Sequence, residues 1–540
     1  MSRFTEALAH SASTDTGMVT GEPNSPTRRS WAEIRHRACA IAGALALEGV
    51  GPGSRVAILV SSPVDVAPLI QAVWMRRAAF TMLQPPTSRA NEAQWAEQTG
   101  ATLSMLDAQC VVVDDSNQDP FDGVRVLRVG DLSSGTAVDP LDPDDAAPAL
   151  LQLSSGSTGT PKAIVITHQN LHANIKAMVA RFDLDQPDQV AVSWLPLYHD
   201  MGMVAFLALP MMTGMDLISV TPTDFLVRPL LWAELISRHR GTFTAAPNFA
   251  YSLLGQRLSR VEDSAYDLSS MRYAVNGAEP VDCVAMDCFQ AEADRFGWPD
   301  TALVGAYGMA EATLTISAPP RHVGLTSETV DPDTLERNAV AVPDPSGRRL
   351  ALLSGPVDGT EVRVVGTVAA IELDCRQLGE FQIRGESVAA QYITIDGLVH
   401  AQDAQGWLST GDLGYLTEHG EVVICGRRKD VIIVSGRNIF PTDIERAVET
   451  VEGVRRGNVA AVSLNAGTAN ERFAVMAETT TAVSDHDAEQ LRRAIATAVL
   501  RTLGVAPARI LVAPAGSVPK TTSGKLQRGR VRDLLAGPRS

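Results

Sequence analysis

The first 300 residues alternate short apolar runs with stretches of helical periodicity, and this alternation constrains the fold more than any other feature. Runs rich in Val, Ile and Leu between turn residues are typical of buried strands. Because parallel strands need a crossover connection, usually a helix, the alternation predicts parallel sheets covered by helices. We expect strands at 54–60, 110–115, 124–129, 150–155, 162–168, 272–279 and 301–308, and helices from Val64 and over 230–240.

The composition and the hydrophobic periodicity of the sequence change after residue 318. Residues 318–350 are rich in proline and poor in periodicity, which is typical of irregular structure. Alternating runs then follow at 361–365, 367–373 and 379–385. These runs predict antiparallel strands in a small β-rich subdomain.

The chain after residue 426 has the pattern of a separate α/β unit. Thr442 and Glu445 have the spacing of a capping box, which predicts the start of a helix. Ser484, with Asp487 three residues later, predicts the start of a second helix. The expected fold class is therefore α/β: a large N-terminal domain of parallel-sheet α/β subdomains with the small β-rich subdomain over 1–427, and a small α+β domain over 428–540.

Charge and composition exclude several classes of protein. The chain has 540 residues, enough for at least two domains, and a net charge of −16, which argues against nucleic acid as a partner. Six cysteines form no CxxC pair, so structural zinc or a disulfide framework is not expected, and a reducing cytoplasm fits. The uncharged stretch 201–215 is short for a membrane span and is expected to be buried core, and the N-terminus has no signal-peptide pattern.

A loop rich in Ser, Thr and Gly ends at Lys162, within the sequence LLQLSSGSTGTPKAIVITH. It is not the P-loop of NTPases, because Gly159 does not adjoin the lysine and Ala163 stands where that motif needs a hydroxyl. Backbone N–H groups and hydroxyls between two strands would still cradle phosphate, although a surface turn is the alternative. Only five of the 46 basic residues are lysines, which favours a specific role for those that remain.

Three further motifs carry possible chemistry. In YGMAE (307–311) the Tyr307 ring suits stacking on a base and the Glu311 carboxylate suits Mg²⁺. In STGDLG (409–414) Asp412 could accept both ribose hydroxyls, or could serve simple turn chemistry. The motifs GRRKD (426–430) and PKTTSGKLQR (519–528) complete the set.

Together, in this order and spacing, the motifs resemble the adenylate-forming superfamily of acyl-CoA synthetases, peptide-synthetase adenylation domains and luciferases. The resemblance covers about residues 30–535. The sequences SWLPLYHDMGMV (193–204), VNGAEPV (275–281) and YGMAEAT are similar to the fatty acyl-AMP ligase branch, and 318–362 is a plausible counterpart of its extra segment. With TAAPNFAY and GRNIFPT, the chain looks most like actinobacterial ligases that serve mycobactin-type siderophore lipidation.

The resemblance implies a reaction and roles for individual residues. A fatty carboxylate would attack the α-phosphate of ATP, with Mg²⁺, to give acyl-AMP and pyrophosphate, and the acyl group would pass to the phosphopantetheine of an acyl carrier protein. The β- and γ-phosphates would be held by the loop residues Ser154, Ser155, Gly156, Ser157, Thr158, Gly159 and Lys162, with Thr158 near the metal. The adenine slot would be lined by Asn276, Gly277 and Ala278, with Tyr307, Gly308, Met309 and Ala310 across it; Glu311 would bind Mg²⁺, and Asp412 and Arg427 would bind the ribose.

The resemblance also implies that the C-terminal domain is a mobile lid. Lys525 on this domain would act on the α-phosphate, and Lys429 would be the hinge about which the domain rotates.

Some interpretations stay open at this stage. His199 suits the mouth of an acyl tunnel formed with Met203 and Phe206, and is also compatible with a packed core position. Residues 426–540 carry a balance of +7, which suits pyrophosphate and an acidic carrier protein, or only a solvated face. The alternatives to a carrier-protein ligase are an acyl-CoA synthetase with CoA as acceptor and a non-enzymatic homologue that only binds acyl-adenylate or a carrier protein.

Overall fold

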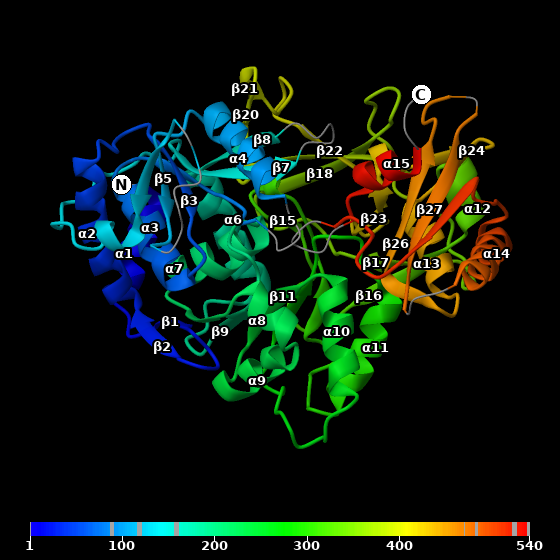
Figure 1. Cartoon of the computed structure of the whole chain (residues 1–540), viewed down its shortest axis with the longest axis horizontal. Coiled ribbons are helices and arrows are strands. Elements are labelled where there is room, and N and C mark those ends of the chain that lie inside the picture. Colours follow the sequence, from blue (N-terminus) through cyan, green and yellow to red (C-terminus); the bar gives the residue numbers. More distant parts are fainter. Residues whose placement is uncertain are drawn as a thin grey trace. The chain divides into compact units, whose positions relative to one another are not determined.

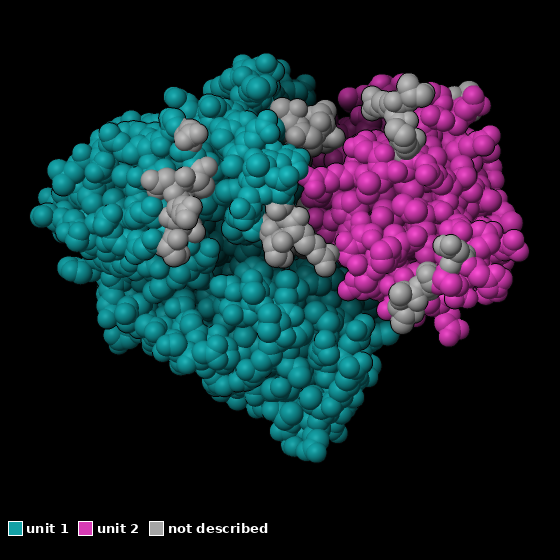
Figure 2. Space-filling view, viewed as in Figure 1, with its two compact units in different colours: residues 1–326, 352–362, 383–409 teal, residues 327–351, 363–382, 410–540 magenta. Residues whose placement is uncertain are grey.

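The computed structural model describes residues 2–86, 91–115, 121, 123–155, 161–468, 470–480, 484–520 and 526–536. The chain divides into two compact units (Figure 2). Unit 1 comprises residues 1–326, 352–362 and 383–409, and unit 2 comprises residues 327–351, 363–382 and 410–540. The boundary predicted at 427/428 stays a prediction.

A seven-stranded sheet forms one half of unit 1, in the order β13-β12-β11-β9-β10-β1-β2. Figure 1 labels its strands β1, β2, β9 and β11. Each neighbouring pair is parallel except β1 and β2, which pair antiparallel at the edge. The central strands β11, β12 and β13 are buried on both faces, as parallel sheets require, whereas the edge strand β2 has no buried residue. Their bounds are β1 Gly17–Thr20, β2 Thr27–Ser30, β9 Val190–Ser193, β10 Asp216–Ser219, β11 Phe243–Ala246, β12 Tyr273–Asn276 and β13 Leu303–Gly305.

An eight-stranded mixed sheet forms the other half of unit 1, in the order β21-β20-β8-β7-β4-β3-β5-β6. From β7 to β6 the pairs are parallel, whereas β7, β8, β20 and β21 pair antiparallel. All the strands predicted for this part of the chain are confirmed. Their bounds are β3 Arg55–Leu59, β4 Ala79–Met82, β5 Cys110–Val113, β6 Arg125–Arg128, β7 Pro148–Ser155, β8 Pro161–Thr167, β20 Gln391–Thr394 and β21 Gly397–His400.

The helices of unit 1 begin at recognisable start signals. A capping box joins Ser30 to Glu33 at the start of α2, and another joins Thr167 to Asn170 at the start of α6. Helix α2 packs on α3, and α10 packs on α11. The bounds are α1 Arg3–Ser11, α2 Trp31–Leu47, α3 Pro63–Met75, α4 Glu92–Leu106, α5 Val129–Leu132, α6 His168–Phe182, α7 Leu209–Thr213, α8 Pro222–Val227, α9 Leu230–His239, α10 Asn248–Leu258 and α11 Cys283–Asp294.

The apolar stretch 201–215 is buried core, as predicted. It forms a π-helix, η1 (Met201–Ala208), followed by α7, and every residue of η1 is buried. In the described part of the chain, no helix combines the length and apolarity that crossing a membrane requires.

Unit 2 is built from small sheets and four α-helices in its described part, and one of these sheets is mixed, because β26 and β27 pair antiparallel and β27 and β28 parallel. Its four-stranded sheet has the order β18-β19-β22-β23, and β26-β27-β28 form a three-stranded sheet. Helices α13 and α14 pack on this second sheet through Ile444, Val448, Ile495 and Val499, all fully buried. The bounds are β16 Thr326–Val330, α12 Pro332–Asn338, β17 Arg348–Leu352, β18 Thr360–Val365, β19 Gly379–Gly385, β22 Leu408–Leu416, β23 Val422–Arg427, β24 Ile432–Val434, β25 Arg437–Ile439, α13 Pro441–Glu449, β26 Val454–Leu464, β27 Arg472–Thr479, α14 Asp485–Leu503, β28 Arg509–Ala513 and α15 Arg528–Ala536.

Both helices predicted for unit 2 are present, and one of their two predicted caps is correct. Ser484 caps α14, because its side chain accepts a hydrogen bond from the Asp487 backbone N–H. The capping box at Thr442 is wrong: α13 starts after Phe440, and Thr442 Oγ1 is buried without a hydrogen-bond partner among the described residues. Proline at position 441 starts the helix instead.

The strand predicted over 367–373 is also wrong. The Gly366 backbone N–H donates to the Ile371 carbonyl over 2.9 Å, and Val365 pairs with Glu372, so the chain turns back on itself here. Val368 is fully exposed at this turn. The residues of 367–373 alternate between apolar and polar types, but no neighbouring strand in the described part of the chain faces them. The alternation therefore predicts a strand that does not form.

Candidate active site

The Ser/Thr/Gly loop lies between two paired strands, as the sequence predicts. Strands β7 and β8 form an antiparallel hairpin in which Ser154 faces Lys162. The Ser154 hydroxyl is buried without a hydrogen-bond partner among the described residues. Residues 156–160 and the side chain of Ser155 lie outside the described part, so the predictions for Ser155, Gly156, Ser157, Thr158 and Gly159 stay predictions.

The lysine that ends this loop pairs with the acidic residue of YGMAE. Lys162 Nζ lies 2.9 Å from Glu311 Oε1, and the two side chains are 28% and 12% exposed. Two residues 149 positions apart therefore form one partly buried ion pair. A charge-assisted contact of this length, away from bulk water, is stronger than a surface ion pair.

Local backbone geometry places Glu311. It lies in a short 3₁₀ turn, η2 (Ala310–Ala312), between the paired strands β14 (Tyr307–Gly308) and β15 (Thr315–Ser317). Glycine is required at 308, because a Cβ there would lie 2.1 Å from the Leu314 carbonyl oxygen. Met309 connects β14 to this turn, and Ala310 is its first residue.

Tyr392 completes this cluster, and sequence reasoning missed it. Its ring lies under the Lys162 ammonium, 3.8 Å from the ring centroid, and its hydroxyl is 3.4 Å from Glu311 Oε1. Burial is the main cause that raises the pKa of Tyr392 above its usual value, and the Glu311 carboxylate adds to it. The signal available in the sequence was an aromatic residue in a strand, which by itself indicates no site.

The residues predicted for the adenine slot follow strand β12. Asn276 ends this strand fully buried; its amide nitrogen donates to Asn248 Oδ1 over 2.8 Å, whereas its Oδ1 has no hydrogen-bond partner among the described residues. Gly277 follows, and Ala278 has a left-handed backbone with φ +74°. An orphaned buried oxygen beside strained backbone at the carboxyl end of a parallel strand is typical of a ligand-binding edge.

Tyr307 lies two residues beyond the end of the neighbouring strand β13. The Ala306 backbone N–H donates to the Asn276 carbonyl over 2.9 Å, which ties the approach to Tyr307 to the end of β12. Tyr307 is 7% exposed. The structure thus brings the predicted aromatic residue next to the predicted slot within unit 1.

His199 lies at the start of the π-helix. Its Nδ1 lies 2.8 Å from Asp200 Oδ1, which also accepts from the Met201 backbone N–H. The side chain of His199 is 27% exposed, so it is not a packed core residue. Met203 and Phe206 are fully buried on η1, and Phe206 stacks on Phe243. Helical stretches of π type are frequent at functional sites.

The predicted ribose residues form a pair of their own in unit 2. Asp412 faces Arg427 across strands β22 and β23, and Arg427 Nε lies 3.1 Å from Asp412 Oδ1. The Asp412 carboxylate is buried and the arginine half exposed. Lys429 is exposed in the 3₁₀ turn η3 (Arg428–Asp430), and Lys525 lies outside the described residues.

Part of the segment predicted as an insertion, 318–362, belongs to unit 2 and is held there by ion pairs. Glu336 of α12 accepts from Arg437 Nη2 over 2.7 Å, and Arg348 Nη1 lies 3.0 Å from Asp443 Oδ2. Residues 327–351 are the part concerned. They contain α12 and most of β16 and β17, in a stretch that the sequence pattern predicts to be irregular.

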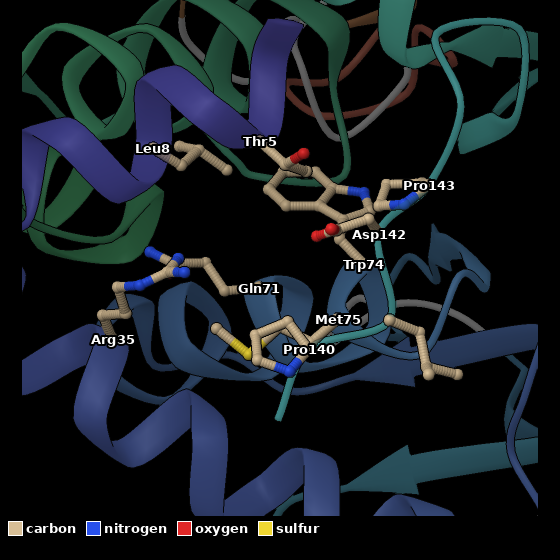
Figure 3. A pocket seen from close by; sticks show the side chains of 10 residues that line it. Thr5, Leu8, Arg35, Gln71, Trp74, Met75, Pro140, Asp142 and Pro143 are labelled. Carbon is tan, nitrogen blue, oxygen red and sulfur yellow. The ribbon is translucent and has the colours of Figure 1, made fainter. Parts of the chain in front are cut away.

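Two pockets of unit 1 contain none of the predicted site residues. A cavity of about 20 Å³ lies beside Gln71 and Trp74 (Figure 3), room for about one water molecule. A larger pocket of about 610 Å³ lies beyond the carboxyl ends of β1, β3 and β10. It is lined by hydroxyl side chains, by Arg29 and Arg37, and by Asp65 and Asp224, and no motif in the sequence indicates it.

Comparison with known proteins defines the class of this chain. The family model described as AMP-binding enzyme matches residues 7–393, and the model described as AMP-binding enzyme C-terminal domain matches residues 436–534. The chain belongs to the AMP-binding enzyme family.

Individual relatives identify the branch of the family to which the chain belongs. The chain is 46% identical to "Putative ligase Rv1013" of Mycobacterium tuberculosis, over 99% of this chain and 100% of that protein. It is 31% identical to the long-chain-fatty-acid–AMP ligase FadD26 of Mycobacterium marinum, over 92% and 90%. A solved structure from a study of fatty acyl-adenylate ligases from E. coli and L. pneumophila superposes with a TM-score of 0.90 at 27% identity, covering 99% of this chain and 98% of that one. The chain is an adenylate-forming ligase of the fatty acyl-AMP ligase branch.

Proposed function

We propose that this enzyme activates a fatty acid with ATP and then transfers the acyl group to the phosphopantetheine thiol of an acyl carrier protein. In the first step a carboxylate oxygen of the fatty acid bonds to the α-phosphorus, and the bond to the bridging oxygen of pyrophosphate breaks. In the second, the thiol sulfur bonds to the acyl carbon, AMP leaves, and the thiol loses its proton.

One observation supports this function most: the 2.9 Å contact between Lys162 and Glu311. An ammonium and a carboxylate at the end of a Ser/Thr/Gly hairpin are the two charges that a metal-bound polyphosphate needs. Lys162 would bind the β- and γ-phosphates, and electrostatic stabilisation of this kind is usually the largest contribution to catalysis. Lys525 is proposed to act on the α-phosphate.

Mg²⁺ fits the residues present. The described part of the chain has no cluster of three or more His, Cys, Asp or Glu side chains that could hold a metal by themselves. Mg²⁺ commonly binds through one or two carboxylates together with substrate phosphates. Glu311 would be such a carboxylate, and Mg²⁺, when bound, offsets the negative charge of the phosphates.

The proposal of a carrier protein as acceptor rests on two observations. The chain is 34% identical to the medium-chain-fatty-acid–[acyl-carrier-protein] ligase JamA of Moorena producens, over 71% of this chain and 67% of JamA. The C-terminal part, residues 426–540, is basic in an otherwise acidic chain, which suits an acidic partner. Siderophore lipidation and a cytoplasmic location are proposed with it, on the resemblance of the sequence alone.

ATP–pyrophosphate exchange with a series of fatty-acid chain lengths tests the first step. We expect exchange that depends on fatty acid and Mg²⁺. Lys162→Gln should lose it, and Lys176→Gln, an exposed lysine on α6, is the matched control. No exchange with any chain length would contradict the enzymatic function.

Mass detection of acyl products, with holo-carrier protein or with CoA, tests the second step. We expect acyl transfer to the carrier protein and little to CoA. Acyl-CoA formation from free CoA at the rate of acyl-AMP formation would instead identify an acyl-CoA synthetase. Lys525→Ala should abolish adenylation and leave transfer from supplied acyl-AMP largely intact; equal loss of both steps would contradict its proposed role.

A further inference from the structure

The pairing of β8 with β20 places an aromatic ring beside the loop lysine. In this antiparallel pair Tyr392 faces Ile164. Lys162 lies two residues from Ile164 and therefore on the same face of β8. Diagonal neighbours on one face of a sheet are within reach of long and aromatic side chains, so the register by itself brings Lys162 and Tyr392 together.

Hydrogen bonds fix this segment relative to Glu311. The Ala389 backbone N–H donates to the Glu311 carbonyl over 2.8 Å. Thr313 Oγ1 donates to the Ser387 carbonyl over 2.7 Å, and both groups are buried. The chain that leads into β20 is thus tied to η2, and the positions of Tyr392 and Glu311 are coupled.

The ring of Tyr392 matters more than its hydroxyl. The Lys162 ammonium lies 3.8 Å from the ring centroid, well within the range of a cation–π contact. The hydroxyl is 3.4 Å from Glu311 Oε1, longer than an ordinary O–H···O hydrogen bond. The ring and the carboxylate contact the same ammonium and restrict a side chain that is otherwise one of the most flexible.

We propose that Tyr392 is a positioning residue for nucleotide binding. Its ring holds the Lys162 ammonium at the end of the phosphate loop, so that little side-chain freedom is lost when phosphate oxygens replace Glu311 as its partner. Tyr392 acts through Lys162 and needs no contact with the nucleotide. This inference rests on the proposed role of Lys162 in binding the phosphates of ATP.

Variants at Tyr392 separate the ring from the hydroxyl. Tyr392→Leu should raise both the KM for ATP and the Kd for a non-hydrolysable ATP analogue about tenfold, with kcat changed less than about threefold, because a cation–π contact of this kind is lost. Tyr392→Phe should bind the analogue within about threefold of the parent enzyme. Tyr266→Leu, a partly exposed tyrosine elsewhere in unit 1, is the control for losing a ring, and thermal unfolding of each variant reports its folding.

A double-mutant cycle decides whether Tyr392 acts through Lys162. In a Lys162→Gln background, Tyr392→Leu should change the Kd for the analogue less than about twofold, because coupled residues are not additive. An unchanged Kd for Tyr392→Leu, a tenfold loss that persists without Lys162, or a Phe variant as weak as Leu would each overturn the proposal. Calorimetric binding needs no fatty acid, so it gives this answer even if fatty-acid-dependent exchange fails.

Discussion

Two ion pairs, one in each unit, have similar lengths and different surroundings. In unit 1, Lys162 and Glu311 lie 2.9 Å apart, and the lysine is 28% exposed. In unit 2, Arg437 and Glu336 lie 2.7 Å apart, with exposures of 11% and 2%. Arg437 also donates through Nε to Glu336 over 2.9 Å and through Nη1 to the Leu503 carbonyl over 2.8 Å.

The difference separates a structural pair from an exchangeable one. The planar guanidinium of Arg437 connects α12, β25 and the end of α14 in one geometry, which suits a permanent contact. The ammonium of Lys162 is a compact charge on a flexible stem and can change partner. Burial raises the pKa of Glu336 although Arg437 opposes the shift, so the buried charge is costly and needs its partner.

The largest effect is expected from breaking the structural pair. Glu336→Leu leaves Arg437 buried without its main partner and should lower the free energy of unfolding by about 3 kcal/mol. Chemical denaturation followed by a probe in unit 2 measures it. The Glu336→Leu/Arg437→Met double variant is the control and should recover most of the loss, because an apolar pair of similar volume can replace a buried ion pair. A double variant no more stable than the single one would show that the pair itself stabilises unit 2.

Breaking the exchangeable pair should affect activity and spare stability. Lys162→Gln is expected to lower the rate of ATP–pyrophosphate exchange about 100-fold, or about 2.7 kcal/mol in transition-state stabilisation. The same change should lower the free energy of unfolding by less than about half as much as Glu336→Leu, because Lys162 is partly exposed whereas Arg437 is nearly buried. A loss of stability as large as that of Glu336→Leu would remove the distinction between the two pairs.

A smaller effect is expected at the predicted ribose residue. Asp412→Asn keeps the size and one acceptor of the buried side chain and loses its charge. We expect the KM for ATP to rise about tenfold, about 1.4 kcal/mol, with kcat changed little, because the ribose is bound equally in the ground and transition states. Steady-state kinetics with varied ATP measures both constants, and an unchanged KM would exclude Asp412 from nucleotide binding.

The smallest effects are expected at the helix starts of unit 2. Ser484→Ala removes a real cap and should cost about 1 kcal/mol. Thr442→Val should change stability by less than about 0.5 kcal/mol, since its hydroxyl is buried without a hydrogen-bond partner in the described structure. Glu445, which the capping box would have used, instead pairs with Arg528 over 2.8 Å. Equal losses in both variants, measured by denaturation, would contradict this assignment.

The parts of the fold that local patterns determine could be predicted from the sequence. Strand β3 and helix α9 lie where their apolar periodicity places them, and the expected strands β7 and β8 flank the Ser/Thr/Gly loop. The errors lie where the structure of a segment depends on what it pairs or packs with. Residues 367–373 have the pattern of a strand but no facing strand among the described residues, and α12 is short and follows a proline-rich stretch. Patterns of neighbouring residues do not show which distant segments of the chain pair with one another.

The same limit applies to the candidate site. Lys162 and Glu311 were each predicted from a motif, and the structure adds that they meet. Tyr392 could not be predicted, because its role follows from the pairing of β20 with β8, between residues more than 220 positions apart. Residues 156–160 and Lys525 stay predictions from the sequence, as does the assignment of Asp412 and Arg427 to a ribose.

The register of β8 has a consequence for sequence variation in this enzyme. Lys162 and Ile164 share a face because two residue steps separate them, and Tyr392 meets that face opposite Ile164. Inserting or deleting one residue between them would turn the lysine to the opposite side of the sheet, away from both Glu311 and the ring. A change of two residues would keep the lysine on its face but move it along the strand by about 6.6 Å, beyond both partners. The composition of this strand can therefore vary, whereas the number of residues between Lys162 and Ile164 is expected to stay constant.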